Sequence, residues 1–141
     1  MLVNRRQIEI EWGDCDAAGI VYYPRYFAFM DACTAHLIEA ATGLKQIGWT
    51  KKYGIVGIPM VDTGAKFMIP AAYGDLLDFE TRAVEVRRSS FRVEHRIYNA
   101  GGALAIEAHE TRVWTGLDPA DPTRLKGHAI PEEVVKALTG G

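Results

Sequence analysis

The chain has 141 residues, a formal net charge of −2 and an apolar content of 48%. This length suits one compact domain with its own core, expected over residues 1–141, and the apolar content excludes a disordered chain. The slight negative charge argues against a general nucleic-acid binder.

Cysteine usage and hydropathy point to the compartment. Cys15 and Cys33 are the only cysteines, which is typical of the reducing cytosol rather than of a disulfide scaffold. The N-terminal residues contain no apolar segment of the kind that a signal peptide needs, and no apolar run is long enough to span a membrane. We therefore expect a cytoplasmic protein without membrane contact.

The first half of the chain predicts a strand, a loop and a long helix. Residues 3–11 alternate as a strand does, and residues 13–22 form a loop. Helical spacing of apolar residues then runs from Tyr23 to Thr42, with Pro24 suited to the first turn and Gly43 to the end. Residues on one face of this helix are Phe27, Met30, Thr34, Leu37, Ile38 and Ala41.

Residues 44–70, which follow this helix, predict a short helical segment and then a strand. Residues 44–54 predict a short helical turn. Residues 55–70 predict one long bent strand, in which glycine and Pro59 allow a bulge or an edge position.

The second half of the chain predicts a meander of strands. Two strands, 76–87 and 89–98, are joined by a tight turn, and a hairpin signal leads into a third strand over 103–115. Residues 116–126 are predicted to be a polar loop, and 131–138 a short terminal helix. Short connections between sequential strands favour an antiparallel sheet, and one apolar helix can cover one face of it. The predicted class is therefore α+β.

The stretch 12–26 carries the clearest chemical signal. Asp14 and Asp16 lie on a loop that glycines can bend, just before the unpaired backbone N–H groups of a helix start near Tyr23. Such a helix end can polarise a carbonyl, and a carboxylate facing it is an arrangement suited to acyl transfer. The alternative is that either aspartate only caps a turn or a helix.

Five other polar residues invite a functional interpretation. Asp31 lies at the margin of the apolar stripe of the helix, where it either bonds to a nearby backbone group or hydroxyl, or faces a ligand. His95, on an apolar strand face, is interpreted as a satisfied core or interface histidine. Glu107, His109 and Glu110 are imaginable metal ligands, but only Glu107 and His109 share a strand face. No third partner is evident, so no metal site is expected.

Several common catalytic motifs are missing from the sequence. It contains no Gly-x-Ser-x-Gly elbow, no phosphate-binding glycine loop and no dinucleotide fingerprint. A carboxylate acting without a histidine remains, and a thioester is reactive enough for it to attack directly or through a water. A cluster of arginines would suit the phosphates of a carrier such as coenzyme A, or it is a solvated strand surface with ion pairs. The cluster comprises Arg82, Arg87, Arg88, Arg92 and Arg96.

The run from Gly13 to Tyr26 resembles the signature of the hotdog-fold acyl-CoA thioesterases, most of all the 4-hydroxybenzoyl-CoA thioesterase branch. The resemblance continues through residues 30–32, 53–57, 87–91 and the last strand, and so covers nearly the whole chain. It implies a long helix wrapped by an antiparallel sheet, and no cofactor, because coenzyme A is part of the substrate. It also implies homodimers joined sheet edge to sheet edge, usually paired into tetramers, with active sites built from both subunits.

The resemblance also implies roles for individual residues. Asp16 would be the nucleophile or the general base, and the backbone N–H of Tyr23 would polarise the thioester carbonyl. Asp31 matches a position that lines the acyl pocket, where it could meet a ring hydroxyl.

The basic run beside the tight turn matches in part. Arg87 and Arg88 match positions that hold coenzyme A phosphates, but Ser89 stands where the family has a lysine, so that contact is weaker or moved. Residues 58–64 also differ from the aromatic-specific pattern. A related branch has a histidine where this chain has Tyr23, and its absence favours the 4-hydroxybenzoyl type.

The expected function is hydrolysis of an aryl acyl-CoA to the free acid and coenzyme A. Two alternatives are a thioesterase for short aliphatic acyl-CoA and a non-catalytic module that binds acyl-CoA. A hotdog-type dehydratase normally relies on an active-site histidine, and none lies within residues 12–26.

Overall fold

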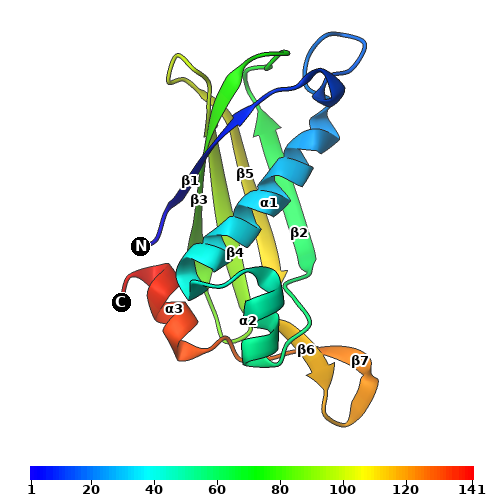
Figure 1. Cartoon of the computed structure of the whole chain (residues 1–141), viewed down its shortest axis with the longest axis vertical. Helices are drawn as coiled ribbons and strands as arrows, with labels where there is room; N and C mark the ends of the chain where they lie inside the picture. The colour runs from blue at the N-terminus through cyan, green and yellow to red at the C-terminus, as the bar shows by residue number, and fades with distance from the viewer.

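A computed structural model describes residues 1–141. One long helix, α1, lies across one face of a five-stranded antiparallel sheet (Figure 1). The strands follow the order β1-β3-β4-β5-β2, so β1 and β2 are the edges. Their bounds are β1 Asn4–Glu9, β2 Met60–Phe67, β3 Leu76–Val86, β4 Ser90–Tyr98 and β5 Leu104–Val113. This arrangement confirms the predicted α+β class.

Helix α1 spans Tyr23–Thr42, the predicted bounds. Pro24 occupies its first turn, and Gly43 ends it with a φ of 73°, a left-handed conformation that glycine adopts without strain. The buried face of α1 comprises Tyr26, Met30, Cys33, Thr34, Leu37 and Ile38. This face of α1 packs onto the inner face of the sheet, and the contact buries both of these faces.

A belt of polar side chains divides the core into two apolar clusters. The cluster on the side where α1 begins includes Met30 and Phe79, and the cluster on the other side includes Leu37 and Phe91. Between them α1 and the three central strands, β3, β4 and β5, place buried polar residues. These belt residues are Thr34 on α1, Thr81 on β3, His95 on β4, and Glu110 and Arg112 on β5.

Two short helices close the end of the core at which α1 finishes. Helix α2 (Gln46–Tyr53) confirms the predicted helical turn, and α3 (Glu132–Thr139) confirms the terminal helix. Trp49 of α2 stacks on Trp114, with ring centroids 5.5 Å apart, and both rings are fully buried. No helix of the chain combines the length and the apolar character that crossing a bilayer requires.

Two predictions of local structure are wrong. The stretch 55–70 is a strand only from Met60 to Phe67, because the segment before it leaves the sheet and makes only an isolated bridge between Gly57 and Thr115. The predicted polar loop is instead a hairpin of β6 (Thr115–Asp118) and β7 (Asp121–Gly127), which projects from the body (Figure 1). Its residues are mostly exposed, so no apolar alternation marked it as two strands.

Candidate functional site

The loop before α1 separates the two aspartates into different roles. Asp14 is buried, and its carboxylate accepts hydrogen bonds from the Arg25 guanidinium at 2.9 and 3.1 Å and from the Glu11 N–H at 2.9 Å. It therefore has a structural role, as the capping interpretation expects. Asp16 is exposed, and only its Oδ1 is engaged, with the Ala18 N–H at 2.9 Å. The Oδ2 atom of Asp16 stays free to act on a ligand.

The loop folds back so that Asp16 lies beside the start of α1. Cys15 and Val21 form an antiparallel bridge, and the Asp16 N–H donates to the Ile20 carbonyl at 2.9 Å. Tyr22 caps the helix without offering a side-chain acceptor, and the Tyr23 N–H donates to no acceptor in the chain. A free carboxylate and a free helix-end N–H thus share one small loop. The N–H carries partial positive charge from the helix.

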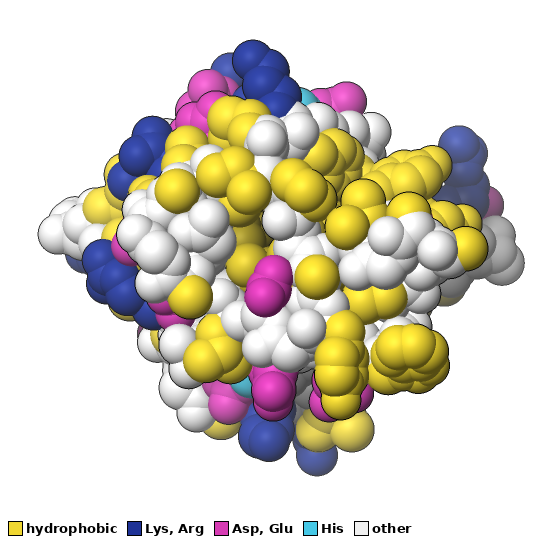
Figure 2. Space-filling view, turned by 90° about the horizontal axis from the view of Figure 1, so that it is seen from above, with side chains coloured by type: hydrophobic (Ala, Val, Ile, Leu, Met, Phe, Trp, Pro, Cys, Tyr) yellow, Lys and Arg dark blue, Asp and Glu magenta, His cyan; other side chains and the backbone are white.

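This end of the molecule is unusually apolar. Seen from above, hydrophobic side chains cover much of it, and the cationic ones lie at the rim (Figure 2). The Tyr23 ring contacts Phe67 of β2, with centroids 6.2 Å apart, and Phe67 also meets Phe27 at 6.2 Å. The exposed apolar residues here are Trp12, Ile20, Tyr22, Tyr23, Phe67, Met68 and Tyr73. An aromatic surface of this kind suits an apolar or aryl group.

Asp31 has a partner that neither sequence interpretation anticipated. Its Oδ1 accepts a hydrogen bond of 2.7 Å from Nη2 of Arg112, which lies 81 positions later in the chain. The Asp31 side chain is 67% exposed, whereas the Arg112 side chain is 7% exposed. The other nitrogens of Arg112 donate to Glu110 and to the Ile58 carbonyl, each at 3.0 Å.

The belt is a connected electrostatic chain that ends at Asp31. Burial by itself would raise the pKa of Glu110, but the His95 ring at 3.1 Å, the Arg112 guanidinium and the Thr34 hydroxyl together lower it. Burial likewise would lower the pKa of Arg112, but Glu110 and Asp31 raise it. Glu110 and Arg112 are therefore held as an ion pair. The His95 ring is fully buried and hydrogen-bonds to Thr81 at 2.9 Å, which confirms it as a satisfied core histidine.

Sequence reasoning considered Glu110 only as an imaginable metal ligand, and it missed Arg112. A signal for them does exist, because both share the buried face of β5 with Ile106 and Ala108. Two charged residues of opposite sign on the buried face of a strand indicate a paired interior site.

The predicted nucleotide contacts lie at the opposite end of the molecule. Arg87, Arg88 and Ser89 occupy the turn between β3 and β4, close to β6 and α3 (Figure 1). Arg88 and Ser89 accept backbone hydrogen bonds from the last part of the chain, at 2.8 and 2.7 Å. The 20 residues of α1, about 30 Å of helix, separate this end from Asp16. One chain alone does not bring the predicted catalytic and nucleotide-binding residues together.

The arginine cluster is only partly paired. Arg87 is exposed and lies 3.4 Å from Glu85, and Arg82 lies 3.9 Å from Glu94. Ser89 faces β7, because a Cβ on Gly127 would lie 3.2 Å from its Oγ. Arg88 is exposed and makes no ion pair, which leaves it available to a phosphate.

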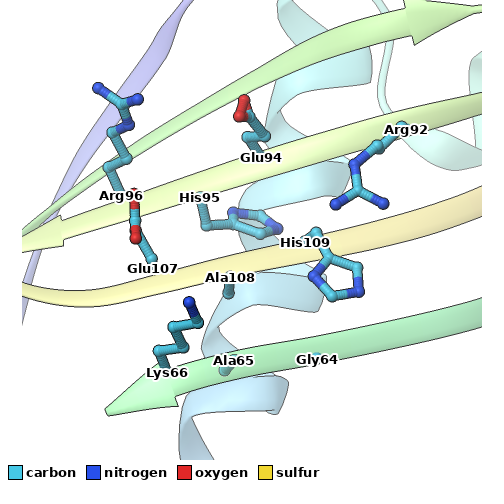
Figure 3. A pocket seen from close by; sticks show the side chains of 10 residues that line it. All are labelled: Gly64, Ala65, Lys66, Arg92, Glu94, His95, Arg96, Glu107, Ala108 and His109. Carbon is cyan, nitrogen blue, oxygen red and sulfur yellow. The ribbon is translucent and has the colours of Figure 1, made fainter. Parts of the chain in front are cut away.

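The outer face of the sheet holds a separate cavity of ≈ 460 Å³, on the side away from α1 (Figure 3). Lys66, Arg92 and Arg96 line it together with Glu107 and His109. The Nε2 atom of His109 lies 3.2 Å from the Asp62 carboxylate. Lysine and arginine side chains lie among the acidic side chains that line this cavity. No group of three His, Cys, Asp or Glu side chains is placed to hold a metal ion.

Comparison with known proteins agrees with the fold. Solved structures with a long helix wrapped by an antiparallel sheet match nearly the whole chain, so the structure has the hotdog fold. The family model of the thioesterase-like superfamily matches residues 10–138. The chain therefore belongs to the thioesterase-like superfamily and is a thioester hydrolase.

The similarity to individual relatives is measured by sequence identity, coverage and TM-score. The 4-hydroxybenzoyl-CoA thioesterase of Pseudomonas sp. strain CBS-3 is 36% identical over 135 residues, covering 92% of this chain and 93% of the relative. Its structure superposes with a TM-score of 0.86 at 34% identity, covering 96% of this chain and 98% of that one. The structure of an aspartate-to-asparagine variant of a 4-hydroxybenzoyl-CoA thioesterase, in complex with 4-hydroxybenzoyl-CoA, superposes with the same TM-score of 0.86 at 33% identity, covering 96% of this chain and 98% of that one.

Two further relatives are more distant. The structure of a gentisyl-coenzyme A thioesterase superposes with a TM-score of 0.77 at 29% identity, covering 96% of this chain and 99% of that one. The acyl-CoA thioester hydrolase YbgC of Escherichia coli is 26% identical over 131 residues, covering 93% of this chain and 92% of the relative.

Proposed function

We propose that the protein hydrolyses an aryl acyl-CoA, 4-hydroxybenzoyl-CoA or a similar thioester, to the free acid and coenzyme A. The observation that carries this proposal is the pairing of a free carboxylate with a free helix-end N–H on one loop, Asp16 and Tyr23, under an aromatic surface. The relatives that act on 4-hydroxybenzoyl-CoA and gentisyl-coenzyme A support an aryl acyl group. No cofactor is needed, because coenzyme A belongs to the substrate.

Each residue has a defined part in the chemistry. The Tyr23 N–H binds the thioester oxygen and stabilises the negative charge that develops on it. Asp16 either attacks the carbonyl carbon, forming a mixed anhydride that water then cleaves, or takes a proton from the water that attacks. In both routes the C–S bond breaks and the thiolate of coenzyme A leaves.

A homodimer completes the site. Strand β2 pairs only with β5, and its outer edge carries the exposed residues Met60 and Val61. An unpaired edge of this kind favours pairing with a second copy about a two-fold axis. Two β2 strands paired antiparallel would bring the Arg87–Arg88 turn of one subunit toward the helix start of its partner. Such a dimer supplies the coenzyme A phosphate contacts that one chain lacks, and Ser89 would add a weaker one.

The test is release of free thiol by the purified protein from a panel of thioesters. The panel contains 4-hydroxybenzoyl-CoA, benzoyl-CoA, phenylacetyl-CoA and several short aliphatic acyl-CoAs. We expect turnover of the aryl substrates with the highest kcat/KM. Turnover of aliphatic substrates alone would replace the aryl assignment, and saturable binding without thiol release would leave a binding module.

A further inference from the structure

The Asp31–Arg112 pair joins an exposed carboxylate to the buried belt. Each donor group of Arg112 has a fixed acceptor: Nε on Glu110, Nη1 on the Ile58 carbonyl and Nη2 on Asp31. Glu110 is fixed in turn by the Thr34 hydroxyl at 2.6 Å and by the His95 ring. Because the guanidinium cannot turn without losing these partners, it holds the Asp31 carboxylate in one place.

The held carboxylate keeps one oxygen for a ligand. Oδ1 of Asp31 accepts from Arg112, whereas Oδ2 accepts no hydrogen bond from the chain. Asp31 also borders a cavity of ≈ 330 Å³ whose walls include Trp49, Ile58 and Pro59. A hydroxyl that reaches this point finds a charged acceptor in a fixed position beside apolar walls.

Asp31 stands in line with the start of α1. Tyr23, Phe27 and Asp31 follow one another at intervals of four residues, so they share one side of the helix. Tyr23 and Phe27 both contact Phe67 of β2 on that side. A flat acyl group that begins at the Tyr23 N–H and runs along this aromatic side therefore points its far end toward Asp31.

The family resemblance implies that Asp31 meets a ring hydroxyl in the acyl pocket. We propose that Arg112 is a positioning residue for that contact: it holds the Asp31 carboxylate in place, and so sets the preference for hydroxylated over unsubstituted acyl groups. This inference rests on the proposed function. Arg112 itself touches no reacting atom and acts through Asp31. The rest of the belt, Glu110 and His95, holds the guanidinium in place.

The test is a double-mutant cycle read out as a specificity ratio, kcat/KM for 4-hydroxybenzoyl-CoA divided by kcat/KM for benzoyl-CoA. The variants are Asp31→Asn, Arg112→Lys and the two combined. Arg112→Lys keeps the buried charge, but one ammonium cannot reach Glu110, the Ile58 carbonyl and Asp31 at once. A general loss of structure lowers both rates together and leaves the ratio unchanged.

We expect a wild-type ratio of about tenfold or more, since hydrogen bonds to charged groups are strong. Asp31→Asn and Arg112→Lys should each remove most of it, and the combined variant should lose no more than Asp31→Asn alone. Arg5→Lys is the matched control, because its ion pair with Glu80 lies on the edge strand β1 and Arg5 belongs to no candidate binding group. That control should keep the wild-type ratio.

The opposite outcomes are equally definite. An unchanged ratio in Arg112→Lys, or an equal further drop on the D31N background, overturns the inference. Wild-type turnover of both substrates at equal kcat/KM overturns it while the proposed function stands, and no thiol release from either overturns both. If Arg112→Lys does not fold, the variant E110Q/R112Q, which removes both buried charges together, takes its place with the same expected loss.

Discussion

The guanidinium of Arg25 donates two hydrogen bonds, of 2.9 and 3.1 Å, to the carboxylate of Asp14. This contact joins the first turn of α1 to the loop that carries Asp16. Asp14 also accepts the Glu11 N–H. Replacing Asp14 by alanine leaves all three donors without this acceptor. We expect the free energy of unfolding to fall by about 2 kcal/mol, with a lower kcat. Urea titration and thiol-release kinetics measure the two effects.

Asp16→Ala is the comparison for this prediction. Asp16 is exposed and gives up a single hydrogen bond, from the Ala18 N–H, so its loss should cost less than about 1 kcal/mol of stability. If Asp14→Ala proved as stable as Asp16→Ala, the Arg25 contact would have no part in holding the loop.

Asp16→Asn tests the chemical role of the free carboxylate. Asparagine keeps the Oδ1 acceptor for Ala18 but can neither attack a carbonyl nor accept a proton at neutral pH. We expect turnover of aryl acyl-CoA to fall by about 10²–10⁴-fold or more, with unchanged stability. Stopped assays with radiolabelled substrate reach rates this low. Normal turnover by this variant would remove Asp16 from the catalytic machinery.

Arg88→Ala tests the nucleotide end of the site. Arg88 is exposed and unpaired, and a phosphate contact contributes equally to substrate and transition-state binding. We expect KM for acyl-CoA to rise about three- to tenfold at low salt with kcat unchanged. The matched control is Arg5→Ala, an exposed arginine on β1 that pairs with Glu80. A KM equal to that of the control would exclude a phosphate contact at Arg88.

Glu110 predicts how stability depends on pH. Its pKa is lowered in the folded protein, although burial opposes this, by His95, Arg112 and Thr34. The unfolded chain therefore binds a proton at Glu110 more readily than the folded one. The resulting stabilisation is complete above the ordinary glutamate pKa of about 4.3 and is lost as pH falls through the folded value. Urea midpoints measured from about pH 7 to pH 3 should follow this course.

The variant Glu110→Gln isolates that contribution. It should be less stable at neutral pH and should show a shallower fall in stability below about pH 4.3 than the wild type. Glu132→Gln removes an exposed carboxylate and is the matched control. A wild-type slope in Glu110→Gln would mean that other carboxylates govern acid unfolding.

Local signals predicted most of the fold. Helix α1 was predicted at its observed bounds because Pro24, Gly43 and a regular apolar spacing all mark the same segment. The β6–β7 hairpin was missed because backbone pairing, not a buried face, defines it, and Pro119 and Pro122 favour a loop reading. A strand with neither face buried leaves no alternation in the sequence.

The parts of the candidate site that could be predicted are those whose residues are close together in the sequence. The loop with Asp16 and the helix start at Tyr23 are close in sequence, so local reasoning found both. The Asp31–Arg112 contact joins residues 81 positions apart, and it depends on how the helix lies on the sheet. Local periodicity carries no information about such a pair. The contacts predicted for Arg87 and Arg88 involve a second chain, so a local sequence pattern cannot specify them either.

The polar belt through the core also fixes the alignment of α1 on the sheet. Apolar side chains on either side of Thr34 would still meet apolar neighbours if the helix slid by one turn along its axis. Such a slip would carry Thr34 and Asp31 away from Glu110 and Arg112, which would keep each other but lose one hydrogen bond each to α1. Hydrogen bonds to charged groups contribute about 1.5–3 kcal/mol each. The belt therefore selects a single register for the helix. Because the loop with Asp16 leads directly into α1, the register of the helix also sets how far that loop extends beyond the sheet.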